Sequence, residues 1–262
     1  MKRVMIASGG TGGHVFPALA VAKELRKQGV EVTWLGTKQG MENRVVPEAD
    51  IELDQISALG FRGKGVFAKL SALKGFALSC IQTVTILRHR KPQVILGMGG
   101  FVTAPAGLVA RTMRIPVVIH EQNRVIGTAN RLLAKIAKRI MEAFPDTFPD
   151  NLSAVHTGNP LRNNIIELAK TTQAEKPQHN TIHLLILGGS LGARTLNQIV
   201  PRAIVSSKIT QFDVVHQCGK QWLEETSCEY QQTKVNVQVK AFIDDMAASY
   251  RWADLVICRA GA

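Results

Sequence analysis

Short runs of apolar residues alternate along this chain with longer stretches in which apolar residues recur every three or four positions. The short runs, bounded by glycine, proline or polar residues, predict buried β-strands, and the longer stretches predict amphipathic helices. In the first part of the chain the predicted strands are Arg3–Ser8, Glu31–Gly36, Ile51–Ile56, Gln93–Leu96, Val117–Glu121 and Leu152–His156. The predicted helices are Phe16–Gln28, Val66–Lys91 and Thr128–Lys138.

The same alternation resumes after a polar stretch, Thr171–Asn180, which we interpret as a connecting segment. The predicted strands of this second series are Thr181–Leu187, Phe212–Gln217, Val235–Val239 and Asp254–Cys258. The predicted helices are Arg194–Ser206, Gln221–Tyr230 and Asp244–Trp252. Strands that alternate with helices form parallel sheets, so the pattern predicts an α/β protein of two doubly wound, Rossmann-like domains facing a cleft. We assign these domains to residues 1–160 and 161–262, and expect the second to be incomplete because Ala262 directly follows its last strand.

Three glycine-rich loops follow predicted strands, at Gly9–His14, Gly97–Gly100 and Gly188–Ala193. Glycine permits tight turns and lets a ligand approach the backbone closely, and the N-terminus of a following helix attracts anions. The first loop lacks the third glycine of the dinucleotide fingerprint, and the chain has no G-x-x-x-x-G-K-[ST] sequence. NAD and a P-loop nucleotide site are therefore disfavoured, and the loops predict another phosphate-containing ligand.

Candidate catalytic groups lie at the ends of two predicted strands. His14 closes the first glycine loop, where a helix N-terminus favours the neutral imidazole that a general base requires. The segment His120–Asn123 brings four polar side chains to another strand end; one or two could line the site, and Glu121 could instead pair with a nearby base. The pair Asp244-Asp245 opens a helix and is interpreted as an N-cap. The chain has no metal-binding D-x-D motif, and its four cysteines are scattered with no C-x-x-C pair, so a zinc site is disfavoured.

Positive charge is concentrated in the first domain. Residues 1–160 hold 21 Lys and Arg against 11 Asp and Glu, and no acid occurs between Asp54 and Glu121. A region this basic predicts an anionic partner, which could be nucleic acid, an acidic membrane surface or a phosphorylated substrate.

The predicted helix Val66–Lys91 carries more apolar residues than one buried face needs. Its expected core stripe consists of Val66, Leu70, Leu73, Ala77, Ile81, Val84 and Leu87. Further apolar residues lie off that stripe, at Phe67, Phe76, Leu78 and Ile86. Bases flank them at Arg62, Lys64, Lys69, Lys74, Arg88, Arg90 and Lys91. Such a face suits an anionic bilayer surface, and the alternative is a second core contact; no stretch is apolar enough to predict a spanning helix.

Seven segments, in order along the whole chain, closely resemble those of the MurG family of bacterial N-acetylglucosaminyltransferases. They are Gly9–Pro17, Gly97–Gly107, His120–Asn123, Gly158–Arg162, Gly188–Ala193, Phe242–Met246 and Cys258–Ala262. The resemblance implies a GT-B fold and an inverting transfer of N-acetylglucosamine that requires no metal and no cofactor. The donor would be UDP-GlcNAc and the acceptor the C4 hydroxyl of the muramoyl-pentapeptide of lipid I, giving lipid II. It also implies a peripheral protein at the cytoplasmic face of the inner membrane, acting in cell-wall synthesis and so in cell shape and division.

Matched motif by motif, the resemblance implies roles for individual residues. Donor contacts would fall on Thr11, Gly12, Gly13, Asn123, Arg162, Ser190, Ile243 and Ala262. The acceptor diphosphate would be held by Gly10, Gly97, Gly99 and Gly100, with His14 as the catalytic base. The membrane face is inferred from the helix pattern instead of a motif: the anionic surface would meet Phe67, Lys69, Lys74, Phe76, Leu78 and Arg88. Because the chain ends before the C-terminal part of the family's length, we expect the 262-residue chain itself to be inactive.

Two other classes of function stay open at this point. Another UDP-sugar enzyme, such as an epimerase or a glycolipid glycosyltransferase, would share the glycine loops, although an epimerase has no need of a basic membrane face. A nucleic-acid-binding protein would share the net charge of +12, but the sequence offers no recognition motif and the glycine loops would be unexplained.

Overall fold

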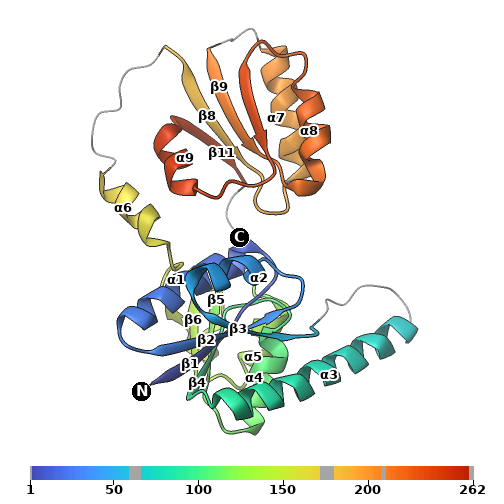
Figure 1. Cartoon of the computed structure of the whole chain (residues 1–262), viewed down its shortest axis with the longest axis vertical. Helices are drawn as coiled ribbons and strands as arrows, with labels where there is room; N and C mark the ends of the chain where they lie inside the picture. The colour runs from blue at the N-terminus through green and yellow to red at the C-terminus, as the bar shows by residue number, and fades with distance from the viewer. Residues whose placement is uncertain (1, 59–65, 172–179, 208–210, 260–262) are drawn as a thin grey trace. The chain divides into compact units, whose positions relative to one another are not determined.

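The computed structural model describes residues 2–58, 66–171, 180–207 and 211–259, and their contacts divide the chain into two units (Figure 1). Unit 1 comprises Met1–Arg162 and unit 2 comprises Asn163–Gly261. The predicted connecting segment lies for the most part outside the described residues. Each unit is an α/β layer structure around its own parallel sheet, as the alternating pattern predicts.

Unit 1 is built on a seven-stranded parallel sheet of order β3-β2-β1-β4-β5-β6-β7. Its strands are β1 (Arg3–Ala7), β2 (Glu31–Thr37), β3 (Glu52–Ile56), β4 (Val94–Gly97), β5 (Val117–Glu121), β6 (Arg139–Glu142) and β7 (Val155–His156). The order reverses direction between β1 and β4, and ligands of doubly wound sheets bind at this switch point, beyond the carboxyl ends of the strands. The loops after β1 and β4 are both glycine-rich, so the topology brings two of the three predicted loops to one place.

Helices cover both faces of this sheet. They are α1 (Gly12–Lys27), α2 (Glu42–Val45), α3 (Val66–Arg90), α4 (Thr103–Thr112) and α5 (Thr128–Leu133), with short 3₁₀ segments η1 (Pro47–Ala49) and η2 (Asp150–Leu152). Successive strand residues alternate between two cores: Ile6 and Trp34 pack with α1 and α2, whereas Met5 packs with α3, α4 and α5. Trp34 is fully buried and its Nε1 donates to the Ser8 carbonyl oxygen at 2.8 Å.

Unit 2 has a four-stranded parallel sheet of order β10-β9-β8-β11. Its strands are β8 (Ile182–Leu187), β9 (Phe212–Gln217), β10 (Asn236–Lys240) and β11 (Leu255–Cys258). Its helices are α6 (Asn163–Thr171), α7 (Arg194–Ser206), α8 (Leu223–Glu229) and α9 (Met246–Trp252), with a 3₁₀ turn η3 (Lys220–Trp222). Helices α7 and α8 lie on one face of the sheet and α9 on the other (Figure 1).

Several element boundaries differ from those predicted. Helix α1 begins at Gly12 rather than Phe16, which places His14 in its first turn. The predicted helix Thr128–Lys138 ends at Leu133, and the strand β6 that follows was not predicted. The predicted strand Leu152–His156 is a 3₁₀ turn followed by the two-residue β7, because Ser153 adopts a left-handed conformation at φ 46°.

The predicted core stripe of the long helix α3 is partly wrong. Leu73 and Ile81 are 64% and 65% exposed, whereas Ser79 and Thr83 are buried. The two hydroxyls donate to backbone carbonyl oxygens one turn earlier, at 2.8 and 2.7 Å, so they are satisfied inside the helix and can face the core. Ile86, expected off the stripe, packs against the core of unit 1. Two residues expected in the core, Leu73 and Ile81, are therefore exposed together with Leu78.

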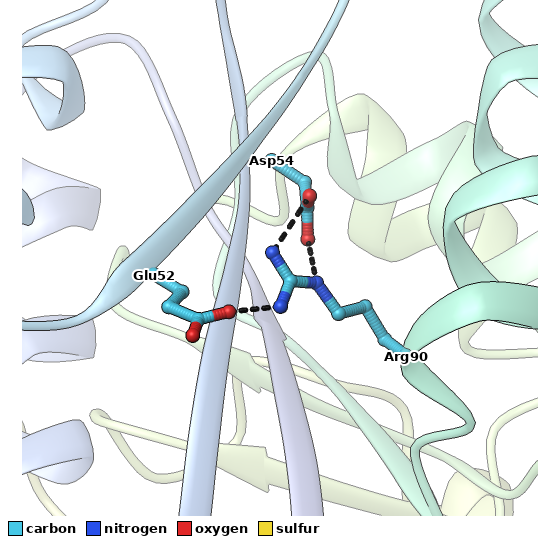
Figure 2. Close-up of polar contacts among 3 residues, drawn as sticks. All are labelled: Glu52, Asp54 and Arg90. Carbon is cyan, nitrogen blue, oxygen red and sulfur yellow. Dashed lines mark hydrogen bonds and ion pairs between the residues drawn. The ribbon is translucent and has the colours of Figure 1, made fainter.

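An ion cluster joins the end of α3 to β3 (Figure 2). The Arg90 guanidinium donates to Asp54 through Nε at 2.8 Å and Nη2 at 3.1 Å, and Nη1 pairs with Glu52. The hydrogen bonds to Asp54 raise the pKa of Arg90. Arg90 thus holds the end of α3 against β3. It does not belong to the bases that flank the apolar face, contrary to the prediction.

Candidate functional site

The first glycine loop connects β1 to α1 and ends in His14. Gly10 has a φ of 97°, a conformation that side chains disfavour, and it is exposed. Thr11 is the N-cap residue of α1 and its side chain makes no cap hydrogen bond. His14 lies half-buried in the first turn of α1, at the carboxyl edge of the sheet.

The loop after β4 packs directly on the first loop. The Met98 amide donates to the Ala7 carbonyl oxygen at 2.9 Å, and the Gly9 amide donates to the Gly99 carbonyl oxygen at 3.4 Å. A Cβ added to Gly100 would lie 2.2 Å from the Gly9 carbonyl oxygen, and one added to Gly99 would lie 2.5 Å from Nδ1 of His14. Both positions also have positive φ values, so this packing requires glycine.

The segment His120–Asn123, at the end of β5, contributes Gln122, the hydrogen-bond partner of His14. Gln122 Oε1 lies 2.9 Å from His14 Nδ1, and Gln122 Nε2 lies 3.1 Å from His120 Nδ1. Nε2 of His120 in turn lies 3.1 Å from the Gly158 carbonyl oxygen. His120 and Gln122 are 2% and 1% exposed. Burial lowers the pKa of His120, which favours the neutral imidazole.

Glu121 is a structural residue, and the idea that it pairs with a base is wrong. Its fully buried carboxylate accepts from the Asn123 amide at 3.0 Å, Asn123 Nδ2 at 2.8 Å, the Gly127 amide at 3.0 Å and Asn130 Nδ2 at 2.9 Å. These neutral donors fix the turn after β5. Glu121 therefore orients Asn123, the half-buried member of the strand end.

Sequence reasoning missed Glu42, on the short helix α2. This fully buried carboxylate accepts from the Gly10 amide at 2.9 Å and from the amide and hydroxyl of Thr37 at 2.9 and 2.8 Å. It ties the first glycine loop to the end of β2. A single acid at the start of a four-residue helix carries no periodic signal, so only the fold identifies it.

The segment Gly158–Arg162 reaches the same edge of unit 1. The Gly158 carbonyl oxygen meets His120, and Asn159 Nδ2 donates to the Gln122 carbonyl oxygen at 3.3 Å. The Arg162 guanidinium lies 4.6 Å from the centre of the Phe16 ring on α1. Unit 1 thus gathers two glycine loops, His14, Gln122 and Arg162 at the switch point of its sheet.

Unit 2 places its glycine loop between β8 and α7. A Cβ added to Gly192 would lie 1.8 Å from the Cys218 carbonyl oxygen, so the loop packs tightly on the end of β9. Ser190 is half-buried in this loop, and the Ile243 amide donates to Gln217 Oε1 at 2.8 Å. A Cβ on Gly189 would lie 3.9 Å from Nη2 of Arg259, a cation at this edge that was not among the predicted residues.

Three further predictions concern residues away from these loops. Asp245 accepts from the Ala248 amide at 2.9 Å, so the predicted N-cap of α9 is confirmed. Lys74, Leu78 and Arg88 are exposed on α3 and Phe76 is half-buried. Ala262 and the side chains of Phe67 and Lys69 lie outside the described residues. Within the described ranges, no cluster of His, Cys, Asp or Glu is arranged to hold a metal ion, and no helix combines the length and apolarity needed to cross a membrane.

His216 forms a second buried network, in unit 2. Its Nε2 lies 3.1 Å from Asn197 Oδ1 and its Nδ1 lies 3.0 Å from the Tyr230 hydroxyl. Asn197 Nδ2 donates to the Cys218 carbonyl oxygen at 2.9 Å, so the network supports the backbone against which Gly192 packs. Burial lowers the pKa of His216 to about 4.

We therefore expect unit 2 to lose stability on acidification. Between pH 6.5 and 4 the unfolded chain binds a proton at His216 that the folded unit excludes, so stability rises with pH across that window. At pH 5 the loss relative to pH 7 is about 2 kcal/mol. Hydrogen exchange of the β9 and α8 peptides at the two pH values measures it. In a His216→Asn variant the same peptides should show a weaker pH dependence; an unchanged dependence would contradict the assignment to His216.

Models of two protein domains match this chain. The Glycosyltransferase family 28 N-terminal domain matches residues 4–142, and the Glycosyltransferase family 28 C-terminal domain matches residues 183–262. Both matches contain glycine loops of the site.

Curated relatives match over the whole chain. A protein of Methylococcus capsulatus named UDP-N-acetylglucosamine–N-acetylmuramyl-(pentapeptide) pyrophosphoryl-undecaprenol N-acetylglucosamine transferase is 51% identical over 261 residues, which cover 100% of this chain and 73% of that protein. A protein of the same name from Pseudomonas aeruginosa is 48% identical, with coverage of 99% and 72%.

Solved structures agree with the sequence matches. The crystal structure of MurG from Acinetobacter baumannii has a TM-score of 0.70 and 42% identity, covering 100% of this chain and 74% of that one. UDP-GlcNAc 2-epimerase from Neisseria meningitidis has a TM-score of 0.64 at 16% identity, covering 100% and 78% of the two chains, and so shows the fold alone. The expected GT-B fold is thereby confirmed.

Proposed function

Because the chain belongs to glycosyltransferase family 28, we propose that it transfers N-acetylglucosamine from UDP-GlcNAc to the C4 hydroxyl of the muramoyl-pentapeptide of lipid I, giving lipid II. The observation that carries this proposal is the meeting of His14 with two glycine loops at the switch point of unit 1. The 51% identity to a relative named for this reaction favours it over an epimerase or a nucleic-acid-binding protein.

The reaction is a direct displacement at the anomeric carbon. His14 accepts the proton of the acceptor hydroxyl, whose oxygen bonds to the anomeric carbon as the bond to the UDP oxygen breaks. The diphosphate leaves with the bonding electrons, and the N-terminus of α7 and Arg162 stabilise its negative charge. His14 then returns its proton to water. A positioned base of this kind contributes ~10²–10⁴-fold to the rate.

We assign acceptor and membrane binding to residues 1–160 and UDP-sugar binding chiefly to residues 161–262. Gly100 is half-buried, which supports its presenting a backbone N–H group to the acceptor diphosphate. Gly10 is exposed but its amide donates to Glu42, so its part is to leave room for the diphosphate. Gly97 and Gly99 are buried against Thr103 and His14, so their part is to shape the loop. The donor would be held by the first turn of α1, by Asn123 and Arg162, and by Ser190 and Ile243 of unit 2.

The proposal is tested by following labelled N-acetylglucosamine from UDP-GlcNAc into a lipid I analogue. The protein is the chain itself and, in parallel, the chain fused to the C-terminal quarter of the Methylococcus capsulatus relative. We expect transfer and stoichiometric UDP release by the fusion without added metal. Failure of the fusion to transfer sugar, while the relative does so in the same assay, would overturn the proposal.

We further propose that the protein binds peripherally to the anionic cytoplasmic surface of the inner membrane. Leu73, Leu78 and Ile81 are exposed on α3, next to the exposed bases Lys74 and Arg88. This pairing of apolar and basic side chains on one helix supports insertion at a charged bilayer surface.

Charge reversal of this face is expected to release the protein from anionic vesicles. Each basic residue lost removes about 1 kcal/mol of binding free energy. The triple substitution Lys69→Glu, Lys74→Glu and Arg88→Glu should therefore weaken vesicle binding at least ~10²-fold, and high salt should also weaken it. Vesicle sedimentation measures the effect. The matched control carries Lys23→Glu, Lys27→Glu and Lys38→Glu. It changes the net charge by the same amount, but on the side of the sheet that α1 covers. Equal loss in both variants would show that net charge, and not this face, governs binding.

A further inference from the structure

A chain of hydrogen bonds runs inward from His14 to the backbone of unit 1. It passes from His14 on α1 to Gln122 and His120 at the end of β5, and ends on the carbonyl oxygen of Gly158. The three distances are 2.9, 3.1 and 3.1 Å. Its inner members are buried, so water does not compete for these bonds.

The inner end of the chain determines the direction of every bond in it. A carbonyl oxygen only accepts, so His120 must carry its proton on Nε2, where it faces Gly158. Burial lowers the pKa of His120, and in the neutral imidazole Nδ1 is then an acceptor. Gln122 must therefore present its amide nitrogen to His120.

A second contact fixes the same orientation of Gln122 independently. Its Nε2 also lies 3.2 Å from the His120 carbonyl oxygen, which again can only accept. Both amide hydrogens of Gln122 are thereby directed at His120, and Oε1 is the atom that faces His14. Because Oε1 has no hydrogen to give, His14 must donate to it from Nδ1.

We propose that Gln122 and His120 are positioning residues that hold His14 as the Nδ1–H tautomer, with the lone pair of Nε2 directed away from Gln122. The catalytic part of this inference rests on the proposed function: the acceptor hydroxyl gives its proton to Nε2. The imidazolium so formed still carries Nδ1–H, so its bond to Gln122 persists and no other bond in the chain has to reverse.

An amide suits this role better than a carboxylate. A carboxylate beside His14 would also fix the tautomer, but it would favour the charged imidazolium, which has no lone pair to accept a proton. The neutral Gln122 orients the ring without adding charge. Gly99 completes the arrangement, because any Cβ there would strike the His14 ring.

The tautomers are measured by long-range ¹H–¹⁵N correlation spectra of the 262-residue chain at neutral pH. We expect His14 to be protonated on Nδ1, and His120 on Nε2. His156 supplies an internal reference, because its Nε2 donates to the Ala143 carbonyl oxygen at 3.1 Å. A His14→Gln variant identifies the His14 signals. His14 protonated on Nε2, or an even mixture of the two forms, would overturn the proposal.

Variants then test each hydrogen bond between His14 and His120. Gln122→Leu removes the acceptor and should lose the single Nδ1–H form of His14. His120→Phe removes one of the two acceptors that orient Gln122 and leaves the backbone carbonyl, so it should retain that form only in part. Gln122→Glu keeps an oxygen acceptor facing His14, so Nδ1 should stay protonated, but the added negative charge should increase the share of charged imidazolium. The control His156→Asn, outside the hydrogen-bond chain, should retain the single Nδ1–H form. Circular dichroism and thermal unfolding identify variants that fail to fold, and for these the spectrum of the unaltered chain decides.

Kinetics of the fusion separate this inference from the proposed function. Gln122→Leu should lower kcat roughly 10–100-fold with little change in the KM for UDP-GlcNAc, and His120→Phe should lower kcat by less. Transfer by the unaltered enzyme with His14 in the Nε2–H form would refute the positioning role alone. An inactive enzyme with His14 in the Nδ1–H form would refute the proposed function and leave the hydrogen-bond chain standing.

Discussion

Replacement of His14 by alanine is expected to lower kcat by ~10²–10⁴-fold, the contribution of a positioned general base. His14 stands in the first turn of α1, with Gly99 against its ring and Gln122 at 2.9 Å from Nδ1. An alanine leaves these surroundings in place and removes the group that accepts the proton. The expected effect is therefore on the chemical step.

The measurement is the steady-state rate of the fusion with UDP-GlcNAc and a lipid I analogue, together with donor affinity by calorimetry. Donor affinity should stay within about twofold, because the imidazole acts on the acceptor. His156→Ala is the matched control, an exposed histidine of the same unit that lies away from the glycine loops. A His14→Ala enzyme within twofold of the unaltered kcat would exclude His14 as the base.

Replacement of Glu121 by alanine is expected to cost unit 1 several kcal/mol of stability. The carboxylate is fully buried and accepts four N–H groups from the turn after β5. Each buried donor left without an acceptor costs about 1–3 kcal/mol, and a whole domain is stable by only about 5–15 kcal/mol. The same change releases Asn123, so donor affinity should fall with stability.

Urea unfolding followed by tryptophan fluorescence measures this loss in unit 1 alone. Trp34 is fully buried in unit 1, and in a Trp222→Phe, Trp252→Phe background it is the remaining tryptophan. Glu121→Gln retains one oxygen acceptor and should lie between the alanine variant and the unaltered chain. Glu48→Ala removes an exposed acid of the same unit and should change stability by less than about 0.5 kcal/mol. An unchanged midpoint for Glu121→Ala would contradict the role assigned to this carboxylate.

Local pattern predicted most of the secondary structure, because it depends on which positions face a core. Strand β5 and helix α7 have the predicted bounds, and glycine loops occur at the predicted strand ends. Strand β6 was missed because the helical pattern of Thr128–Lys138 continues up to its first residue. The buried face of α3 was also misassigned, since Ser79 and Thr83 satisfy their hydroxyls within the helix and so occupy positions expected to be apolar.

The sequence by itself determined the two parallel sheets, the glycine loops and His14 at the end of the first loop. Each follows from residue type and spacing over a few positions, where sterics and burial act locally. The tertiary structure decided that Gln122, 108 residues away, is the partner of His14, that Glu121 serves the turn after β5, and that Glu42 supports Gly10. The assignments of Gln122 and Glu42 are non-local because a buried polar group takes whichever donor or acceptor the packed sheet brings within about 3 Å, and sequence spacing carries no record of that choice.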